Sequence, residues 1–382
     1  MAMPASCPVL EFVDDQSDSI VTDLAYDYHG RRLASVSADG MIRIRDLDDN
    51  GVWCVEEGCE IKLAHQGTLW KVDWAHPGFG KQLLATCSQD RTVKIWEEHS
   101  EAAPGHERSG IGPSRGAPAR WIVATTLKDS RYGVVDVKFA PRHLGLRIAS
   151  ASEDGHVRVY KATDLSSVSG WKMAPWPFVP CPDGLGVTCI SWCSSPFLKP
   201  LLVVGTMSGL VQIWLSDGTT EELGKWSKVL DLTEHGSRGV SSVSWSPQFC
   251  TTFDRIATCG GDGRVRVHRL ERRDLAEAAW ASTQTAHLKD EKGETEGVAW
   301  SAEWDVNGSA LCSTDGNTCR TWISEGDGVS NNWCCTDVFQ EVGVGGSGGG
   351  GVAGTDRKTT MDRYEEGSAP APPAKVPEIL EG

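Results

Sequence analysis

Short stretches in which β-branched residues alternate with polar ones recur along the whole chain. Residues 93–96 read Val-Lys-Ile-Trp, residues 157–160 read Val-Arg-Val-Tyr, and residues 265–268 read Val-Arg-Val-His. A period of two is typical of a β-strand with one buried face. An Asp-Gly pair or a relative of it precedes most of these stretches, and it supplies the positive-φ positions of a tight turn. The pattern therefore predicts a series of β-hairpins.

This hairpin pattern occurs six times. The turn positions are Asp39, Asp90, Asp154, Ser208, Asp262 and Asp315, which stand 51, 64, 54, 54 and 53 residues apart. A further strand is expected before each hairpin, and a segment opened by Trp follows each one, at Trp53, Trp121, Trp171, Trp226, Trp280 and Trp333. Six successive units of about four strands predict an all-β fold, a six-bladed β-propeller of the WD-repeat type.

The repeated aspartates are interpreted as turn formers and not as catalytic groups, because a residue that recurs in every unit is architectural. This prediction covers the structural blade turns at Asp39, Asp90, Asp154, Asp262 and Asp315. The second unit alone comes close to the full WD set, with His65, Ser88, Asp90 and Trp96. We expect that set to form a hydrogen-bonded brace across the strands of its blade.

The two ends of the chain differ from the repeats. Residues 1–18 are predicted to be an N-terminal arm with one edge strand at residues 8–13, and residues 19–341 to be the propeller. Residues 342–382 are rich in Gly, Pro and Ala and are predicted to be a disordered tail, since they cannot bury enough apolar surface to offset the entropy of ordering. Residues 97–120 are predicted to be a surface insertion of similar composition.

The net charge and the absence of several motifs argue against some classes of function. The formal net charge of −15 argues against a general nucleic-acid binder and against an anionic-membrane binder, which need a basic face. No apolar stretch is long enough for a membrane span, and no phosphate-binding loop, metalloprotease motif or nucleophile elbow occurs. The 13 cysteines form no CxxC pair. We therefore expect no enzymatic activity, no cofactor, no metal site and no small-molecule substrate.

Long segments of the repeats resemble a known family. The stretches LWKVDWAHPGFGKQLLATCSQDRTVKIWEE from Leu69 and DSRYGVVDVKFAPRHLGLRIASASEDGHVRVYKA from Asp129 are similar to the Seh-one nucleoporins, WD-repeat propellers related to the Sec-thirteen protein. The resemblance implies a non-catalytic scaffold of the nuclear pore Y complex, located at the nuclear envelope. It implies an α-solenoid scaffold nucleoporin as partner, together with other Y-complex subunits. It also implies a second role in a coat-like complex on the vacuolar or lysosomal surface that regulates nutrient signalling.

In that family the propeller does not close on itself, and a partner inserts strands that complete the ring. The sequence is consistent with this, since segment 8–13 adds a seventh outer strand to six hairpins. An unpaired sheet edge is a template for strand addition. The candidate partner-binding residues are Val9, Glu11, Val13, Asp337 and Phe339. Ordinary pairing of these edges within the chain remains an equal alternative.

Two other functions stay open. One is a vesicle-coat subunit like the Sec-thirteen protein. The other is a substrate adaptor of a ubiquitin ligase, which usually carries a Trp-Asp-x-Arg signature after a blade strand. The matching positions here read Trp-Glu-Glu-His at residues 96–99, so the adaptor has little support.

Overall fold

The computed structural model describes a large part of the chain. These residues are 19–55, 59–100, 119–165, 167–175, 177–178, 180, 184–196, 198–219, 222–232, 235–247, 253–274, 279–288, 298–316, 318–324 and 332–340. The chain divides into two compact units, residues 1–341 and 342–382, and all described residues belong to the first. The predicted edge strand at residues 8–13 and the predicted disordered tail at 342–382 lie outside the described residues and stay predictions, as do the domain boundaries.

The described strands form six antiparallel sheets, each a consecutive run along the chain. The first two sheets contain β1 (Val21–Tyr26), β2 (Arg32–Ser37), β3 (Ile42–Leu47), β4 (Trp53–Cys54), β5 (Glu60–Ile61), then β6 (Leu69–Trp74), β7 (Leu83–Ser88), β8 (Val93–Ser100) and β9 (Ala119–Leu127). The next two contain β10 (Val134–Phe139), β11 (Arg147–Ser152), β12 (Val157–Ala162), β13 (Trp171–Met173), then β14 (Val187–Trp192), β15 (Leu201–Thr206), β16 (Val211–Ser216) and β17 (Trp226–Asp231). The last two contain β18 (Val240–Trp245), β19 (Phe253–Gly260), β20 (Val265–Asp274), β21 (Ala279–Leu288), then β22 (Ser301–Trp304), β23 (Ala310–Thr314), β24 (Thr318–Ser324) and β25 (Trp333–Gln340).

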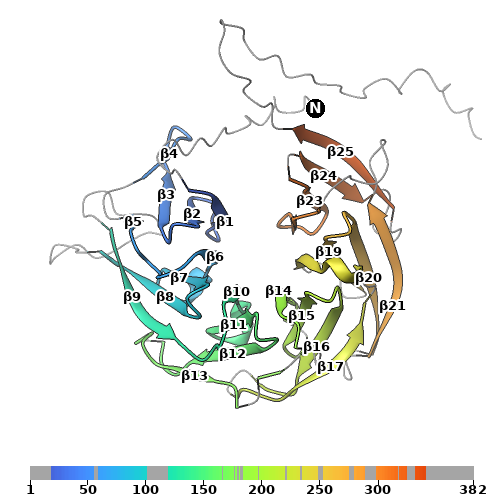
Figure 1. Cartoon of the computed structure of the whole chain (residues 1–382), viewed down its shortest axis with the longest axis horizontal. Coiled ribbons are helices and arrows are strands. Elements are labelled where there is room, and N and C mark those ends of the chain that lie inside the picture. The colour runs from blue at the N-terminus through green and yellow to red at the C-terminus, as the bar shows by residue number, and fades with distance from the viewer. Residues whose placement is uncertain are drawn as a thin grey trace, which may run out of the picture. The chain divides into compact units, whose positions relative to one another are not determined.

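The sheets are blades set side by side around an axis, with the first strand of each blade innermost (Figure 1). Three 3-10 turns, at Pro77–Phe79, Arg142–Leu144 and Gly236–Arg238, are the helical elements of the described part. The prediction of an all-β, six-bladed propeller is confirmed. None of these described helical turns is long and apolar enough to cross a membrane.

Four hairpin turns place a glycine where the Asp-Gly pattern predicts a residue with positive φ. Gly40, Gly155, Gly263 and Gly316 all adopt positive φ, between 74° and 80°. The second blade departs from the Asp-Gly pattern, and there Arg91 itself takes a φ of 69°. A left-handed residue is costly without glycine, so the second blade carries local strain that its neighbours avoid.

The hydrophobic core is divided among the blades. Five clusters of buried side chains fill the spaces between blades one and two, two and three, three and four, four and five, and five and six. Since side chains alternate along a strand, one face of each blade packs against the preceding blade and the other face against the following one. A closed ring of six blades would need a sixth cluster, and the described residues form none between blades six and one.

Polar contacts reinforce this packing near the axis. A carboxylate on the innermost strand of one blade accepts a hydrogen bond from the backbone of the next innermost strand. The N–H groups of Val72, Phe139 and Ile190 donate to Asp23, Asp73 and Asp136 at 3.0, 2.6 and 2.8 Å. Each such bond ties two neighbouring blades, so the order of the ring depends on these side chains as well as on apolar burial.

Two elements differ from the sequence prediction. The outer strand of the first blade is split into β4 and β5, which pair with opposite ends of β3. The predicted surface insertion at residues 97–120 is shorter than expected, because β8 continues to residue 100 and β9 begins at residue 119. The middle of the insertion lies outside the described residues. The six segments predicted to open with Trp all form outer strands, at β4, β9, β13, β17, β21 and β25.

Candidate binding surface at the two open blade faces

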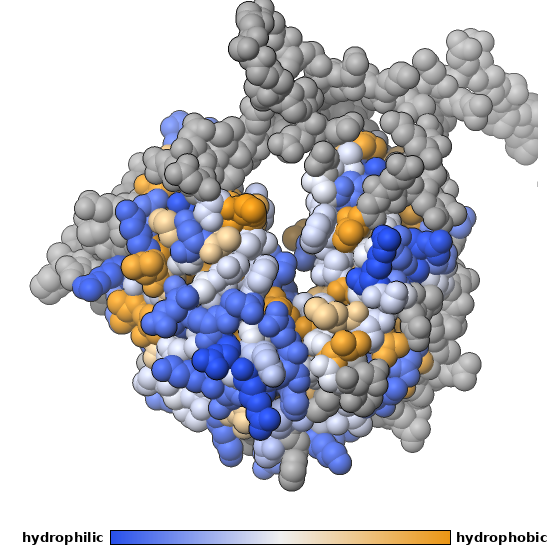
Figure 2. Space-filling view, viewed as in Figure 1, coloured by the Kyte–Doolittle hydropathy of each residue, from blue (hydrophilic) through white to orange (hydrophobic). Residues whose placement is uncertain are grey.

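Blades one and six each have one face with no neighbouring blade among the described residues. Figure 1 shows β1 on one side of the resulting opening and β23 to β25 on the other, and the space-filling view in Figure 2 shows the same opening. We call these surfaces the first-blade face and the last-blade face. The first-blade face is formed by Leu24, Tyr26, Leu33, Ser35, Arg43 and Arg45. The last-blade face is formed by Cys312, Thr314, Cys319, Thr321, Asp337 and Phe339.

The first-blade face exposes apolar side chains that every equivalent strand buries. Leu24 occupies the position on β1 that Val72, Val137, Ile190 and Val243 occupy on the innermost strands of blades two to five. Those four residues are 0–6% exposed, whereas Leu24 is 50% exposed. Tyr26 is 60% exposed, although the equivalent Trp74 is only 7% exposed. Leu33, Ser35, Arg43 and Arg45 on the same face are buried. The exposed apolar surface is therefore concentrated on β1.

The last-blade face differs in composition from the equivalent face of blade five. In blade five the corresponding positions of β19 and β20 hold Ala257, Cys259, Val265 and Val267, all at most 6% exposed. In blade six they hold Cys312, Thr314, Cys319 and Thr321, which are all half-buried. Small polar residues and thiols thus replace the apolar set that normally packs against a following blade.

The outer strand β25 completes the last-blade face. Phe339 lies opposite Cys319, and Asp337 lies opposite Thr321. The equivalent residues of blade five, Leu288 and Ala286, pack against the core between blades five and six. Phe339 is instead 49% exposed, and Asp337 is exposed too. A large aromatic ring held on a strand and left half in water is the kind of contact that a partner can bury.

The other predicted partner-binding residues, Val9, Glu11 and Val13, lie outside the described residues. Thus the structure brings Asp337 and Phe339 together on one face. It adds Leu24 and Tyr26, which the sequence analysis did not select. Their exposure follows from the missing neighbour, so the strand pattern of residues 21–26 alone could not identify them.

The turn aspartates make different contacts in different blades. In blade two, Asp90 accepts from Nδ1 of His65 at 2.9 Å, and Nε2 of that ring lies 2.9 Å from Oγ1 of Thr86. The indole N–H of Trp96 donates to the same Thr86 hydroxyl at 2.9 Å. The predicted brace therefore exists but uses Thr86 where the sequence analysis named Ser88. The Ser88 hydroxyl instead accepts from the backbone N–H of Asp90 at 3.1 Å.

Blade five contains a second brace of this kind, which the sequence analysis missed. His235 lies 2.9 Å from Asp262 through Nδ1 and 2.8 Å from Oγ1 of Thr258 through Nε2. Burial lowers the pKa of His235 to about 4, and the adjacent Arg266 acts in the same direction. The ring is thus neutral at pH 7. The signal in the sequence is that His235 precedes its turn aspartate by 27 residues, close to the 25 that separate His65 from Asp90.

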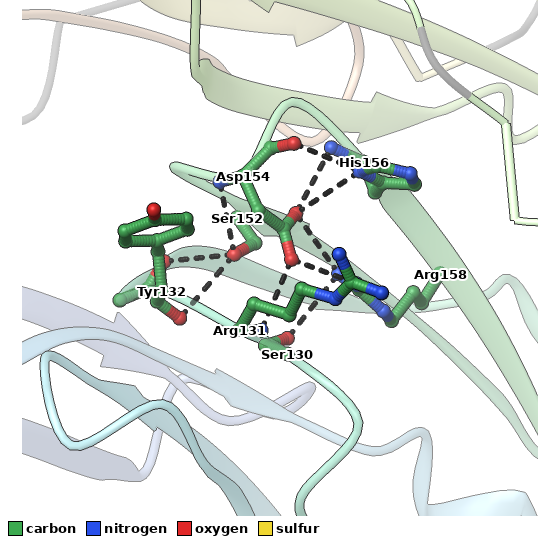
Figure 3. A network of polar contacts seen from close by, with 8 residues as sticks. Ser130, Arg131, Tyr132, Ser152, Asp154, His156 and Arg158 are labelled. Carbon is green, nitrogen blue, oxygen red and sulfur yellow. Dashed lines mark hydrogen bonds and ion pairs between the residues drawn. The ribbon is translucent and has the colours of Figure 1, made fainter. Parts of the chain in front are cut away.

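Blade three replaces the histidine with arginine. Arg158 donates to both carboxylate oxygens of Asp154, at 3.1 and 2.7 Å, and the backbone N–H of Arg131 donates to the same carboxylate at 3.1 Å (Figure 3). Burial alone would raise the pKa of Asp154, but the hydrogen bonds from Arg158 hold it below its ordinary value. In Figure 3 the side chains of Asp154 and Arg158 point toward each other.

The remaining two turn aspartates also accept hydrogen bonds from residues of their own blades. Asp315 accepts from Arg320 and Thr318 in blade six. Asp39 accepts from the Ser37 hydroxyl and, at 3.1 Å, from the Met41 N–H in blade one. Each aspartate accepts hydrogen bonds within its own blade, an arrangement that can brace its hairpin. Within the described residues, no group of three or more His, Cys, Asp or Glu is arranged to hold a metal ion.

Comparison with known proteins identifies the family. Residues 7–46, 58–97 and 226–269 match the family model described as "WD domain, G-beta repeat". Nucleoporin SEH1 of Osmerus mordax is 33% identical over 347 residues, covering 88% of each chain. Nucleoporin SEH1 of Homo sapiens is 31% identical over 353 residues, covering 90% of this chain and 92% of the relative.

This chain belongs to the nucleoporin SEH1 family. The resemblance predicted from the residues after Leu69 and Asp129 is thereby confirmed. Among solved structures, a chain in the "Crystal Structure of Mitotic Checkpoint Complex" has a TM-score of 0.52 and 16% identity, and the match covers 78% of this chain and 72% of that one. At that identity the likeness shows the fold alone.

Proposed function

We propose that this SEH1-family protein is a non-catalytic structural scaffold of the nuclear pore Y complex. In this proposal it assembles by accepting strands from an α-solenoid nucleoporin. The observation that carries the proposal is the pair of open blade faces, where Leu24, Tyr26 and Phe339 expose apolar surface at positions that other blades bury. A partner that laid strands between these faces would supply the missing neighbour for both blades.

The bounds of the three family-model matches support a seventh blade to which this chain would contribute only an outer strand. The matches that begin at residues 58 and 226 start at an outer strand, β5 or β17, and continue through three strands of the next blade. The remaining match begins at residue 7, which supports an outer strand at residues 8–13 ahead of the first blade. Blade six already has its own outer strand in β25. An extra outer strand would therefore need inner strands from another chain, and Val9, Glu11 and Val13 would lie beside them.

The chemistry of the faces fits a strand better than a small molecule. Strands placed between the two faces would hydrogen-bond to one another, and their alternate side chains would pack on the apolar positions of the two blades. The first-blade face offers the exposed β1 residues, and the last-blade face offers Phe339 with Asp337 beside it. The turn aspartates are all occupied within their blades, which supports a role without catalysis.

The family resemblance also supports the rest of the proposal. Location at the nuclear envelope and binding to other Y-complex subunits follow from it, with no direct contact to nucleic acid and no membrane insertion. A second role in a coat-like complex on the vacuolar or lysosomal surface rests on the resemblance alone.

Affinity purification of the full chain from its own cells, followed by mass spectrometry, tests the proposal. Wild-type protein is expected to recover an α-solenoid nucleoporin and other Y-complex subunits. Recovery of coat subunits without nucleoporins would favour the vesicle-coat alternative, and recovery of ubiquitin-ligase subunits would favour the adaptor. Recovery of vacuolar or lysosomal coat components beside nucleoporins would support the second role.

Two variants test the site itself. Leu24→Asp and Phe339→Asp place a charge at half-exposed positions of the two open faces, so the fold should persist. Each is expected to reduce recovery of the scaffold nucleoporin roughly tenfold or more, as the loss of a central apolar contact does. Leu165→Asp is the matched control, since Leu165 is 52% exposed in the loop of blade three. Full recovery with both face variants would show that the partner binds elsewhere.

A direct measurement complements the purification. A strand-bearing segment of the recovered scaffold, added to the isolated chain at about 100 times its Kd, should stabilise the folded state by roughly 2.7 kcal/mol and raise its melting temperature. No shift at saturation would contradict strand insertion while leaving membership of the complex intact.

A further inference from the structure

Two thiols meet on the last-blade face. Cys312 on β23 and Cys319 on β24 lie diagonally across the hairpin, and their Sγ atoms are 3.0 Å apart. Both residues are half-buried free cysteines. The separation is already shorter than a normal contact between two sulfur atoms and is about 1 Å longer than the roughly 2.05 Å of a disulfide bond. Formation of the bond therefore requires the two Sγ atoms to approach each other by about 1 Å.

Cysteines on the equivalent faces of other blades are different. Cys87 in blade two and Cys259 in blade five are fully buried in the cores between blades. Burial raises the pKa of both thiols well above the ordinary value. Buried, protonated thiols are inert. The absence of a following blade among the described residues leaves the Cys312–Cys319 pair within reach of solvent.

The surroundings of the pair favour one thiolate. The hydrogen bond from Cys312 lowers the pKa of Cys319 to about 7, against the effect of partial burial, and the nearby Arg320 acts in the same direction as that bond. The same hydrogen bond raises the pKa of Cys312. At neutral pH Cys319 is partly ionised, and a thiol that donates to a thiolate is typical of reactive dithiols. A thiol with a pKa near the ambient pH is also the best attacking group in disulfide exchange.

We propose that Cys312 and Cys319 are a reversible disulfide site on the last-blade face, oxidised by low-molecular-weight disulfides of the glutathione class. The Cys319 thiolate attacks one sulfur of the oxidant, forms a mixed disulfide and releases one thiolate. Cys312 then loses its proton and attacks Sγ of Cys319, which releases the second thiol and leaves the Cys312–Cys319 bond. Two protein thiols are oxidised, and one disulfide is reduced to two thiols. The site goes beyond the proposed scaffold function and does not rest on it.

The sequence allows the oxidation state of the pair to be measured on one peptide. Cys312 and Cys319 are the two cysteines of a single tryptic peptide, residues 293–320. The full chain is equilibrated in buffers of glutathione and glutathione disulfide of defined ratio, quenched in acid and alkylated. Peptide mass spectrometry then reads the state of the pair. A reducing buffer should give two alkyl groups on the peptide, and an oxidising buffer should give an unlabelled peptide lighter by two hydrogen atoms.

Matched variants separate the roles of the two thiols. Cys312→Ser should trap Cys319 as a mixed disulfide with glutathione, because no second thiol resolves it. Cys319→Ser should leave Cys312 unmodified under the same conditions. Cys334→Ser, a half-buried cysteine on β25 of the same blade, should behave as wild type. Retention of both alkyl groups on wild-type protein across the whole range of ratios would overturn the proposal, as would equal mixed-disulfide formation at Cys312 and Cys319.

Discussion

Two matched substitutions test whether the ring is open between blades one and six. Leu24 and Ile190 occupy the same position of the innermost strand in blades one and four, but Leu24 is 50% exposed and Ile190 is 1% exposed. Truncation of a buried Ile to Ala costs about 2–5 kcal/mol, because a cavity adds to the lost transfer energy. Full burial of a Leu side chain contributes about 1.5–3 kcal/mol. Half of that, with no cavity, puts the cost of Leu24→Ala at about 0.8–1.5 kcal/mol.

The assay is urea denaturation of the full chain at 25 °C, followed by tryptophan fluorescence. At a slope of about 3 kcal/mol per M, Ile190→Ala should lower the midpoint by about 0.7–1.7 M and Leu24→Ala by about 0.3–0.5 M. The slopes of the variants must agree with wild type, since only then do midpoints compare stabilities. Equal midpoint shifts for the two variants would refute the reasoning, because Leu24 would then be as buried as Ile190 in solution.

Three further predictions concern the braces and the contacts between blades. Thr86→Val should lower the unfolding free energy by about 1–3 kcal/mol, since the buried Trp96 indole N–H loses its acceptor and the buried Nε2 of His65 loses its donor; Thr321→Val, on the last-blade face, should stay within about 0.5 kcal/mol of wild type, and both are read from urea midpoints. Between pH 6.5 and about 4 the unfolded chain binds a proton at His235 that the folded chain does not, so stability should fall as the pH falls. His235→Gln should remove about 1.4 kcal/mol per pH unit of that slope in thermal or urea unfolding, and an unchanged slope would contradict a neutral His235. Asp136→Ala should cost at least about 2 kcal/mol in the same assay, because the buried N–H groups of Val137 and Ile190 lose an acceptor; a cost below about 0.5 kcal/mol would show that the tie between blades three and four is dispensable.

The braces show how blades that lack part of the WD residue set can still hold the turn aspartate. Asp154 is held by Arg158, Asp262 by both His235 and Arg266, and Asp90 by His65. Each of these side chains donates a hydrogen bond to a partly buried carboxylate, and such a carboxylate needs a donor to offset the loss of water. A blade can therefore lose its histidine without losing its turn, provided that a strand residue after the turn is basic.

The sequence predicted much of the fold because its signals are local. Alternation in residues 93–96 and a turn at Asp39-Gly40 each specify a hairpin from a few neighbouring residues. Six copies of that signal, each followed by a Trp-opened segment, were enough to count the blades. The same reasoning selected Ser88 in place of Thr86 and missed His235, since the partner of a hydroxyl or a ring depends on which strands become adjacent.

The composition and order of the repeats thus determined a six-bladed propeller, its turn residues and its family by sequence alone. Only the tertiary structure decided which faces are covered. Leu24 and Ile190 are alike in sequence pattern, yet one is in water and the other is in a core, because burial depends on the presence of a neighbouring blade. Cys312 and Cys259 likewise lie on the same face of equivalent strands, but only Cys312 lies next to another thiol and near solvent. The proposed function rests on that difference between the end blades and the middle blades, which no local pattern contains.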